Sequence, residues 1–131
     1  MGYSCHKMNQ HLKPLYWVSS SLEDLKSCPS TVQDDIGYAL HRAQEGKRHP
    51  KAKILKGFGG GGVLEIMEND DGDTYRAIYT VKFALATYVL HVFKKKSKSG
   101  IATPKPDIDL MKQRLKLAEQ HYIKAQRGEK A

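Results

Sequence analysis

The chain has 131 residues, a formal net charge of +8 and 40% hydrophobic residues, as expected for one globular domain. No apolar run approaches the ~20 residues of a transmembrane helix, and residues 1–10 lack the apolar stretch of a signal peptide, so we expect a cytoplasmic protein without a membrane partner. Cys5 and Cys28 form neither a CxxC pair nor a zinc-like Cys/His spacing, which predicts two free thiols and neither metal nor cofactor.

The positive charge lies in the C-terminal part of the chain. Residues 1–81 carry ten Lys/Arg and ten Asp/Glu, whereas residues 82–131 carry twelve Lys/Arg and four Asp/Glu. Clustered cations displace counterions from phosphates, so this asymmetry indicates a polyanionic partner. Nucleic acid and an acidic protein both fit, and a solvated basic surface stays open as the plain alternative.

The N-terminal part predicts a tail, a strand and a short helix. Residues 1–13 show no periodicity and are expected to be a flexible tail, followed by a β-prone strand over residues 15–18. Ser20 followed by Glu23 fits a capping box at the start of a helix, which must stop before Pro29.

A second, longer helix is predicted next. Ser30 and Gln33 repeat the capping signature, and Gly46 is placed to end the helix. One face of the helix is apolar, formed by Val32, Ile36, Ala39, Leu40 and Ala43. The two helices therefore form a hairpin that can cover a sheet.

A basic loop is predicted over residues 47–62, ending in four consecutive glycines, 59–62. Its cations are Lys47, Arg48, Lys51, Lys53 and Lys56. No GK[ST] follows the glycines, so a flexible linker is favoured over a phosphate-binding loop.

Three strands follow the loop. The first covers residues 63–67, and a turn over residues 69–73 joins it to a strand over residues 74–81. The third, residues 88–93, is almost wholly apolar, as in a strand buried on both faces.

An amphipathic helix is predicted at the C-terminal end, after Pro104 and Pro106. Asp107 opens it, where a negative charge is favourable near the helix dipole. An apolar stripe follows at spacings of three and four, formed by Ile108, Met111, Leu115, Ala118 and Tyr122. We expect this stripe to pack on the protein's own core rather than on a partner.

The element order predicts an α+β domain over residues 14–125, with a flexible C-terminus at 126–131. The sheet should have about four mainly antiparallel strands. We expect helices on one face and an open opposite face that is basic near the end of the last strand.

Certain runs carry a family resemblance: Lys56-Gly57, Leu64-Glu65-Ile66, Tyr75-Arg76-Ala77-Ile78-Tyr79, Tyr88-Val89-Leu90-His91-Val92-Phe93-Lys94-Lys95-Lys96-Ser97 and Lys98-Ser99-Gly100-Ile101-Ala102-Thr103-Pro104. Together they resemble the RelE/ParE superfamily, most of all its phage-related, HigB-like branch. The resemblance covers about residues 14–123. It implies a RelE-like fold and a type II toxin that cleaves mRNA, often on the ribosome, without a metal, and that is silenced by a helix-turn-helix antitoxin.

The implied reaction is attack of a ribose 2′-hydroxyl on the adjacent phosphate, which needs a base, an acid and cations. The resemblance points to Arg76 and Lys95 as the cations, and His91 can serve as acid or base. In RelE itself, lysines occupy strand positions that here carry Glu65 and Met67, so Glu65 is a second candidate base or a charge partner of Arg76. The candidate RNA-binding residues are Lys56, Tyr79, Lys94, Lys96 and Lys98.

Two other functions stay open at this point. A ParE-like inhibitor of DNA gyrase would share the fold without the nuclease residues. A prophage-derived RNA-binding protein would use the basic surface without catalysis. Arg76 and Tyr79 could equally be structural, and His91 could be a buried histidine held by a backbone group.

Overall fold

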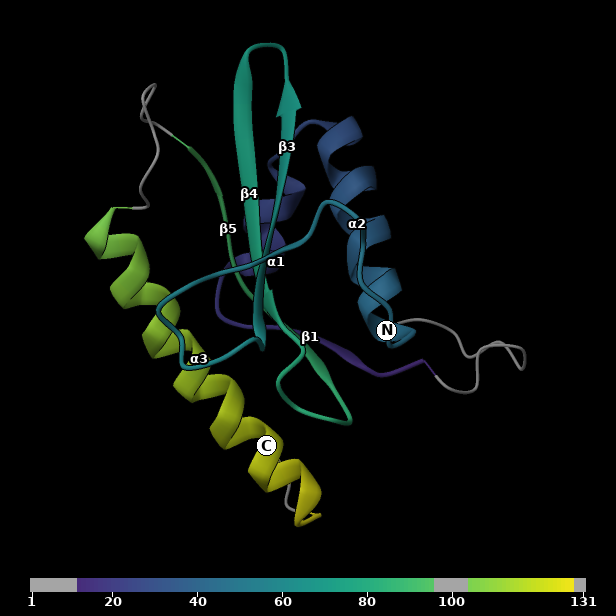
Figure 1. Ribbon diagram of the computed structural model, residues 1–131, viewed down its shortest axis with the longest axis vertical. Coiled ribbons are helices and arrows are strands. Elements are labelled where there is room, and N and C mark those ends of the chain that lie inside the picture. Colours follow the sequence, from purple (N-terminus) through teal and green to yellow (C-terminus); the bar gives the residue numbers. More distant parts are fainter. Residues whose placement is uncertain (1–11, 96–103, 129–131) are drawn as a thin grey trace.

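The computed structural model describes residues 12–95 and 104–128, which form five strands and three helices (Figure 1). In chain order they are β1 (Leu15–Trp17), α1 (Ser21–Lys26), α2 (Ser30–Gln44), β2 (Lys53–Ile54), β3 (Val63–Asp70), β4 (Asp73–Thr80), β5 (Thr87–Lys94) and α3 (Lys105–Gln126). The predicted α+β class is confirmed. The free thiol expected at Cys5 lies outside the described residues, whereas Cys28 is a buried free cysteine.

The strands form one sheet in the order β1-β5-β4-β3-β2. β3, β4 and β5 are antiparallel neighbours, as predicted, and β1 pairs in parallel with β5 after the helical excursion. The expected loop over residues 47–62 contains the additional edge strand β2, in which Lys53 pairs with Glu65 and Ile54 with Leu64. Two exposed residues carry no alternating pattern, so the sequence did not reveal this strand.

The β3–β4 hairpin has a two-residue turn at Asp71 and Gly72. Their φ angles are +50° and +85°, the left-handed region that a type I′ turn requires at both positions. Such a turn matches the twist of the flanking strands, so the hairpin continues to its tip and both strands run longer than predicted on the turn side.

α1 and α2 cover one face of the sheet. The apolar residues predicted for α2 are all buried, and they pack against Leu64, Ile66, Ala77, Tyr79, Val89 and Val92. Gly46 ends the helix as predicted: its φ is +81°, and the next amide, of Lys47, donates to the carbonyl of Arg42 at 2.8 Å.

Both predicted capping boxes are wrong. The Ser20 hydroxyl donates to the Asp24 carboxylate at 2.8 Å instead of accepting from a helix amide. Pro29, not Ser30, precedes the first turn of α2, and the Gln33 amide donates to the carbonyl of Cys28 at 2.8 Å. These side chains satisfy neighbouring groups other than the helix amides.

α3 packs on the other face, so the prediction that this face is open is only partly right. Met111 and Ala118 are buried there against Ile78, Tyr88 and Leu90, which confirms the core role of the apolar stripe. Arg114, also buried, donates from Nη1 to the Leu90 carbonyl at 2.9 Å. α3 lies along the β5 side of the sheet and does not cover the far part of the β3–β4 hairpin (Figure 1).

A bulge in β5 decides where His91 faces. Tyr79 pairs with Val89 and Ile78 with His91, so Leu90 is an extra residue. Leu90 packs on the α3 side, and His91, the next residue, contacts Asp107 of α3 on that same side. Regular alternation would have turned His91 toward α1 and α2.

Candidate nucleic-acid interface

A hollow of about 340 Å³ lies on the α3 side of the sheet, over the part of the β3–β4 hairpin that α3 leaves uncovered. Its lining residues are Lys51, Lys53, Glu65, Met67, Asn69, Thr74 and Lys95. Three lysines and one carboxylate thus line this hollow, which we call the lysine groove, although the Lys51 ammonium binds Glu68 at 3.3 Å. An arrangement of ammonium groups around an open sheet surface suits a phosphate chain.

Strand alternation and pairing explain how these side chains meet. Glu65, Met67 and Asn69 are alternate residues of β3 and point to one side, while Lys53 is the direct cross-strand neighbour of Glu65. Thr74 lies opposite Asn69 on β4. The backbone amide of Lys95 donates to the Thr74 carbonyl at 2.8 Å, which continues the pairing beyond β5 and brings this lysine to the groove.

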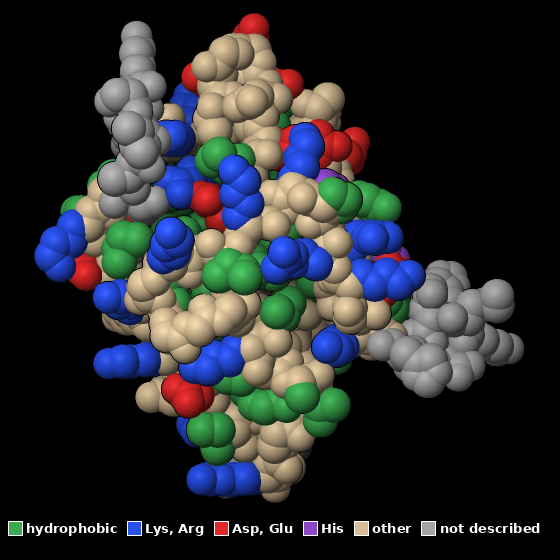
Figure 2. All heavy atoms as spheres, viewed as in Figure 1, with side chains coloured by type: hydrophobic (Ala, Val, Ile, Leu, Met, Phe, Trp, Pro, Cys, Tyr) green, Lys and Arg blue, Asp and Glu red, His purple; other side chains and the backbone are tan. Residues whose placement is uncertain are grey.

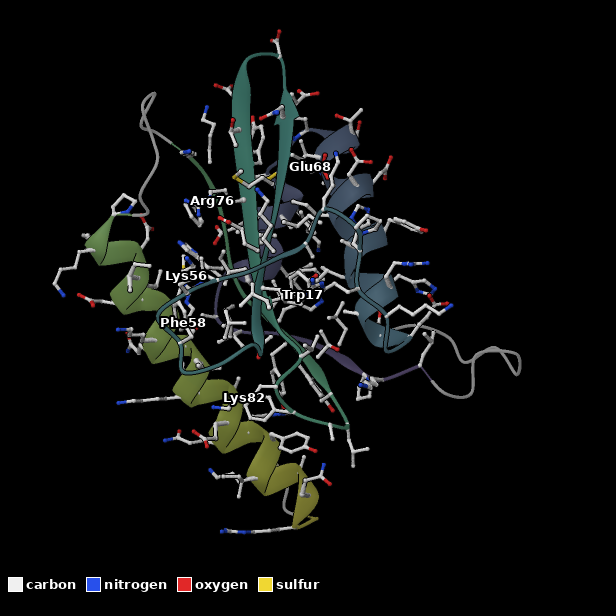
Figure 3. All side chains as sticks on the ribbon, viewed as in Figure 1. Trp17, Lys56, Phe58, Glu68, Arg76 and Lys82 are labelled. Carbon is white, nitrogen blue, oxygen red and sulfur yellow. The ribbon has the colours of Figure 1, made fainter. Side chains whose placement is uncertain are left out.

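Glu65 and Arg76 form a buried ion pair beside the groove. Nε and Nη2 of Arg76 both donate to Oε2 of Glu65, and the two residues are only 5% and 8% exposed. The guanidinium also lies over the ring of Phe93, 5.4 Å from its centre. Figure 3 shows Arg76 on the α3 side of the hairpin and Glu68 on the α2 side. Arg76 is therefore placed to hold and orient Glu65, whose side chain lines the groove.

His91 is held by α3. Its Nε2 lies 3.0 Å from Oδ1 of Asp107, its ring stacks on Phe93 with centres 4.5 Å apart, and Nδ1 is buried without a partner among the described residues. His91 lines a separate hollow beside α1, with Asp24, Cys28 and Lys94. Phe93, which contacts both the His91 ring and the Arg76 guanidinium, lies between His91 and the Glu65–Arg76 pair.

The structure brings together three of the four predicted catalytic residues, Glu65, Arg76 and Lys95, and sets His91 apart. Of the predicted RNA-binding residues, Tyr79 is fully buried under the α1–α2 layer and belongs to the core, so it cannot line an RNA site on the surface. Lys94 lies 3.6 Å from Asp73 and lines the hollow beside α1.

The remaining predicted contacts fall elsewhere. Lys56 is exposed in the loop that crosses toward α3, outside the groove lining (Figure 3). Lys96 and Lys98 lie outside the described residues.

Sequence reasoning missed the contribution of β2. Lys51 and Lys53 were predicted only as charged residues of a basic loop, because a two-residue strand has no sequence pattern that predicts its pairing with β3. Asp107 was read as a helix-opening charge and not as the partner of His91. A carboxylate shortly after a histidine-containing strand is the signal that could have suggested the pair.

The described residues contain no group of three or more His, Cys, Asp or Glu side chains that could hold a metal ion. Among the same residues, no helix combines the length and apolar character needed to cross a membrane.

Stability should depend on pH through His91. Burial lowers the pKa of His91 below its usual 6.5, opposed by the hydrogen bond with Asp107. The unfolded chain then takes up a proton at higher pH than the folded chain, so the free energy of unfolding should fall as the pH drops from about 6.5 to the lower pKa of folded His91. Asp107→Asn should lower this pKa further and extend the loss to more acidic pH.

NMR titration of the His91 ring and urea unfolding across this pH range would measure both effects. Asp109→Asn is the matched control, because Asp109 lies on the same helix and pairs with the exposed Lys105. An equal pKa of His91 in the wild type and Asp107→Asn would show that Asp107 does not control the histidine.

The fold and the groove together define a RelE-like α+β protein, and comparisons with known proteins agree. A solved structure of a double arginine-to-alanine mutant of Escherichia coli toxin RelE in the free state is similar to this chain with a TM-score of 0.52 and 18% identity, covering 80% of this chain and 96% of that one. A family model described as phage-derived protein Gp49-like (DUF891) matches residues 23–116, so the chain belongs to the Gp49-like family. A search of curated proteins found no match. The RelE-like fold that the resemblance implied is thus confirmed.

Proposed function

We propose that this protein is the toxin of a type II toxin-antitoxin system and cleaves mRNA in the lysine groove. The observation that carries the proposal is the placement of Lys53 and Lys95 beside Glu65 in the lining of one hollow on an open sheet surface. The RelE-like fold supports it. The lysines that RelE has at the positions of Glu65 and Met67 are absent here, and Lys53 and Lys95 supply positive charge at the same place from β2 and from the end of β5.

The groove can supply the groups that RNA cleavage needs. Glu65 accepts the proton of a ribose 2′-hydroxyl, whose oxygen attacks the adjacent phosphorus. The bond to the 5′-oxygen breaks, leaving a 2′,3′-cyclic phosphate, and a lysine ammonium gives a proton to the departing 5′-oxygen. Lys53 and Lys95 stabilise the additional negative charge of the phosphorane, and Arg76 holds Glu65 in place.

The surface charge favours this mode of binding. Lys and Arg side chains gather over the middle of the face in Figure 2, whereas acidic side chains gather near the tip of the β3–β4 hairpin. An RNA strand would therefore cross the sheet below the hairpin tip. By the same chemistry, a helix-turn-helix antitoxin with acidic side chains is the partner that we propose would silence the protein.

Induction in bacteria tests the function. Wild type should arrest growth and create new mRNA 5′ ends within codons, and Lys53→Gln/Lys95→Gln should lose both effects because phosphate binding is weakened. These lysines are better targets than the buried Arg76, since their replacement leaves no unpaired buried charge. Lys112→Gln/Lys116→Gln, which removes the same charge from exposed positions of α3, should still arrest growth.

Three outcomes would contradict the proposal. Arrest with intact mRNA and double-strand DNA breaks would indicate a gyrase inhibitor. Equal arrest by the groove variant would place the site elsewhere. Absence of arrest by folded wild type would favour a non-catalytic RNA-binding protein. In support of that alternative, Arg76 is already bound by Glu65 and His91 by Asp107.

A further inference from the structure

A second basic hollow, of about 240 Å³, lies on the α2 side of the sheet. Lys13, Lys47 and Arg48 line it together with Gly61 and Leu64, and no carboxylate is part of its lining. We call it the rear hollow. None of its three cations forms an ion pair with a carboxylate within the part of the chain that the structure describes.

Hydrogen bonds fix the backbone at two of these residues. The amide of Lys13 donates to the carbonyl of Gln44 at 2.9 Å, and the side-chain amide of Gln44 donates back to the Lys13 carbonyl at 2.8 Å. Lys47 is fixed by its bond to Arg42 at the end of α2. The backbone that carries Lys13 and Lys47 is thus fixed to the C-terminal end of α2.

The glycine run meets the hollow from the other side. Gly59 and Gly60 have φ angles of +74° and +139°, which side-chain-bearing residues rarely adopt, and Gly61 reaches the lining. At Gly62 an added Cβ would come within 2.8 Å of the Lys82 side chain, so the glycines allow the loop to close against the end of β4. The glycines are therefore needed for the conformation of this loop, whereas a flexible linker would not need glycine at particular positions.

The two hollows are neighbours across the sheet edge. Leu64 lines the rear hollow and Glu65, the next residue of β3, lines the lysine groove. The sheet edge there is β2, two residues long, and the segment that leads into it carries Lys51. Figure 2 shows Lys and Arg side chains from the middle of the face toward the end of α2. The rear hollow has no carboxylate in its lining, and Glu65, the carboxylate of the groove lining, is bound by Arg76, so a flexible polyanion could pass from one hollow to the other.

We propose that single-stranded RNA continues from the lysine groove around β2, and that Lys13, Lys47 and Arg48 bind a backbone phosphate in the rear hollow. This inference rests on the proposed function, because it assumes that RNA occupies the groove. The rear hollow is then a substrate-binding extension that favours longer RNA and takes no part in the chemical step.

Length-dependent binding tests the path. The probes are 2′-O-methyl oligouridines of about 4 and about 16 nucleotides, which cannot be cleaved because they lack the attacking hydroxyl. Lys47→Gln/Arg48→Gln should bind the long probe about tenfold more weakly near 0.1 M salt and reduce the slope of log affinity against log salt by about 0.7, the value for one lost phosphate contact. Its affinity for the short probe should equal that of wild type.

Two further variants make the outcomes decisive. Lys53→Gln/Lys95→Gln should weaken binding of both probes, and Lys112→Gln/Lys116→Gln should leave the preference for the long probe unchanged. Wild-type affinity of Lys47→Gln/Arg48→Gln for the long probe overturns the inference, as does an equal loss in the α3 variant. If the groove variant also binds both probes normally, the proposed function itself fails at its first step.

Discussion

Arg76→Met alone is expected to lower the free energy of unfolding by about 3–5 kcal/mol, because it leaves the Glu65 carboxylate buried without its partner. Glu65 is 8% exposed, and two nitrogens of Arg76 bind one of its oxygens. The substitution also removes the cation–π contact with Phe93. Methionine keeps much of the volume of the arginine stem, so the loss reports mainly the unpaired charge.

The double variant Glu65→Leu/Arg76→Met separates charge pairing from packing. Removing both charges abolishes the desolvation cost together with the attraction, so its stability should equal or exceed that of wild type. Urea unfolding of the wild type, both single variants and the double variant gives the coupling free energy. A double variant as unstable as Arg76→Met would show that the pair is held by packing contacts rather than by its charges.

Local signals in the sequence predicted most of the fold. The apolar face of α2, the stop at Gly46 and the turn at Asp71 and Gly72 each depend on spacing within a few residues, and the structure confirms them. Where local signals failed to predict an element or its packing, the structure there is determined by contacts between residues far apart in the sequence. β2 exists only because Lys53 and Ile54 meet β3, and the face that α3 covers depends on tertiary packing.

The candidate site was predicted less completely for the same reason. Alternation correctly places Glu65 and Arg76 near each other, since these residues are on paired strands and face one side. The position of His91 depends on the bulge at Leu90, and the lysines of the groove come from two segments that are far apart in the sequence. Tyr79 illustrates the opposite error: proximity in sequence to Arg76 suggested a shared site, but its side chain is fully buried on the other face.

Glu65→Gln is expected to slow RNA cleavage by about 100- to 10,000-fold, the usual contribution of a general base, while RNA affinity stays near that of wild type. An amide can still accept a hydrogen bond from Arg76 but cannot take the proton of the 2′-hydroxyl. Single-turnover cleavage of an mRNA fragment measures the rate, and a 2′-O-methyl probe measures affinity. Both are compared at a temperature at which the variant is fully folded.

Glu68→Gln is the matched control for this experiment. Glu68 is three residues further along β3, is 6% exposed and binds Lys51 at 3.3 Å, but its side chain points to the α2 side of the sheet. Its replacement removes an equally buried carboxylate and releases Lys51, so any general effect of a lost buried charge or of a released cation appears in both variants. Equal rates in the two variants would remove Glu65 as the base and leave His91, which needs Asp107 to release Nε2 before it can meet RNA. A selective loss in Glu65→Gln would instead assign the proton transfer to the one carboxylate that strand alternation turns into the lysine groove.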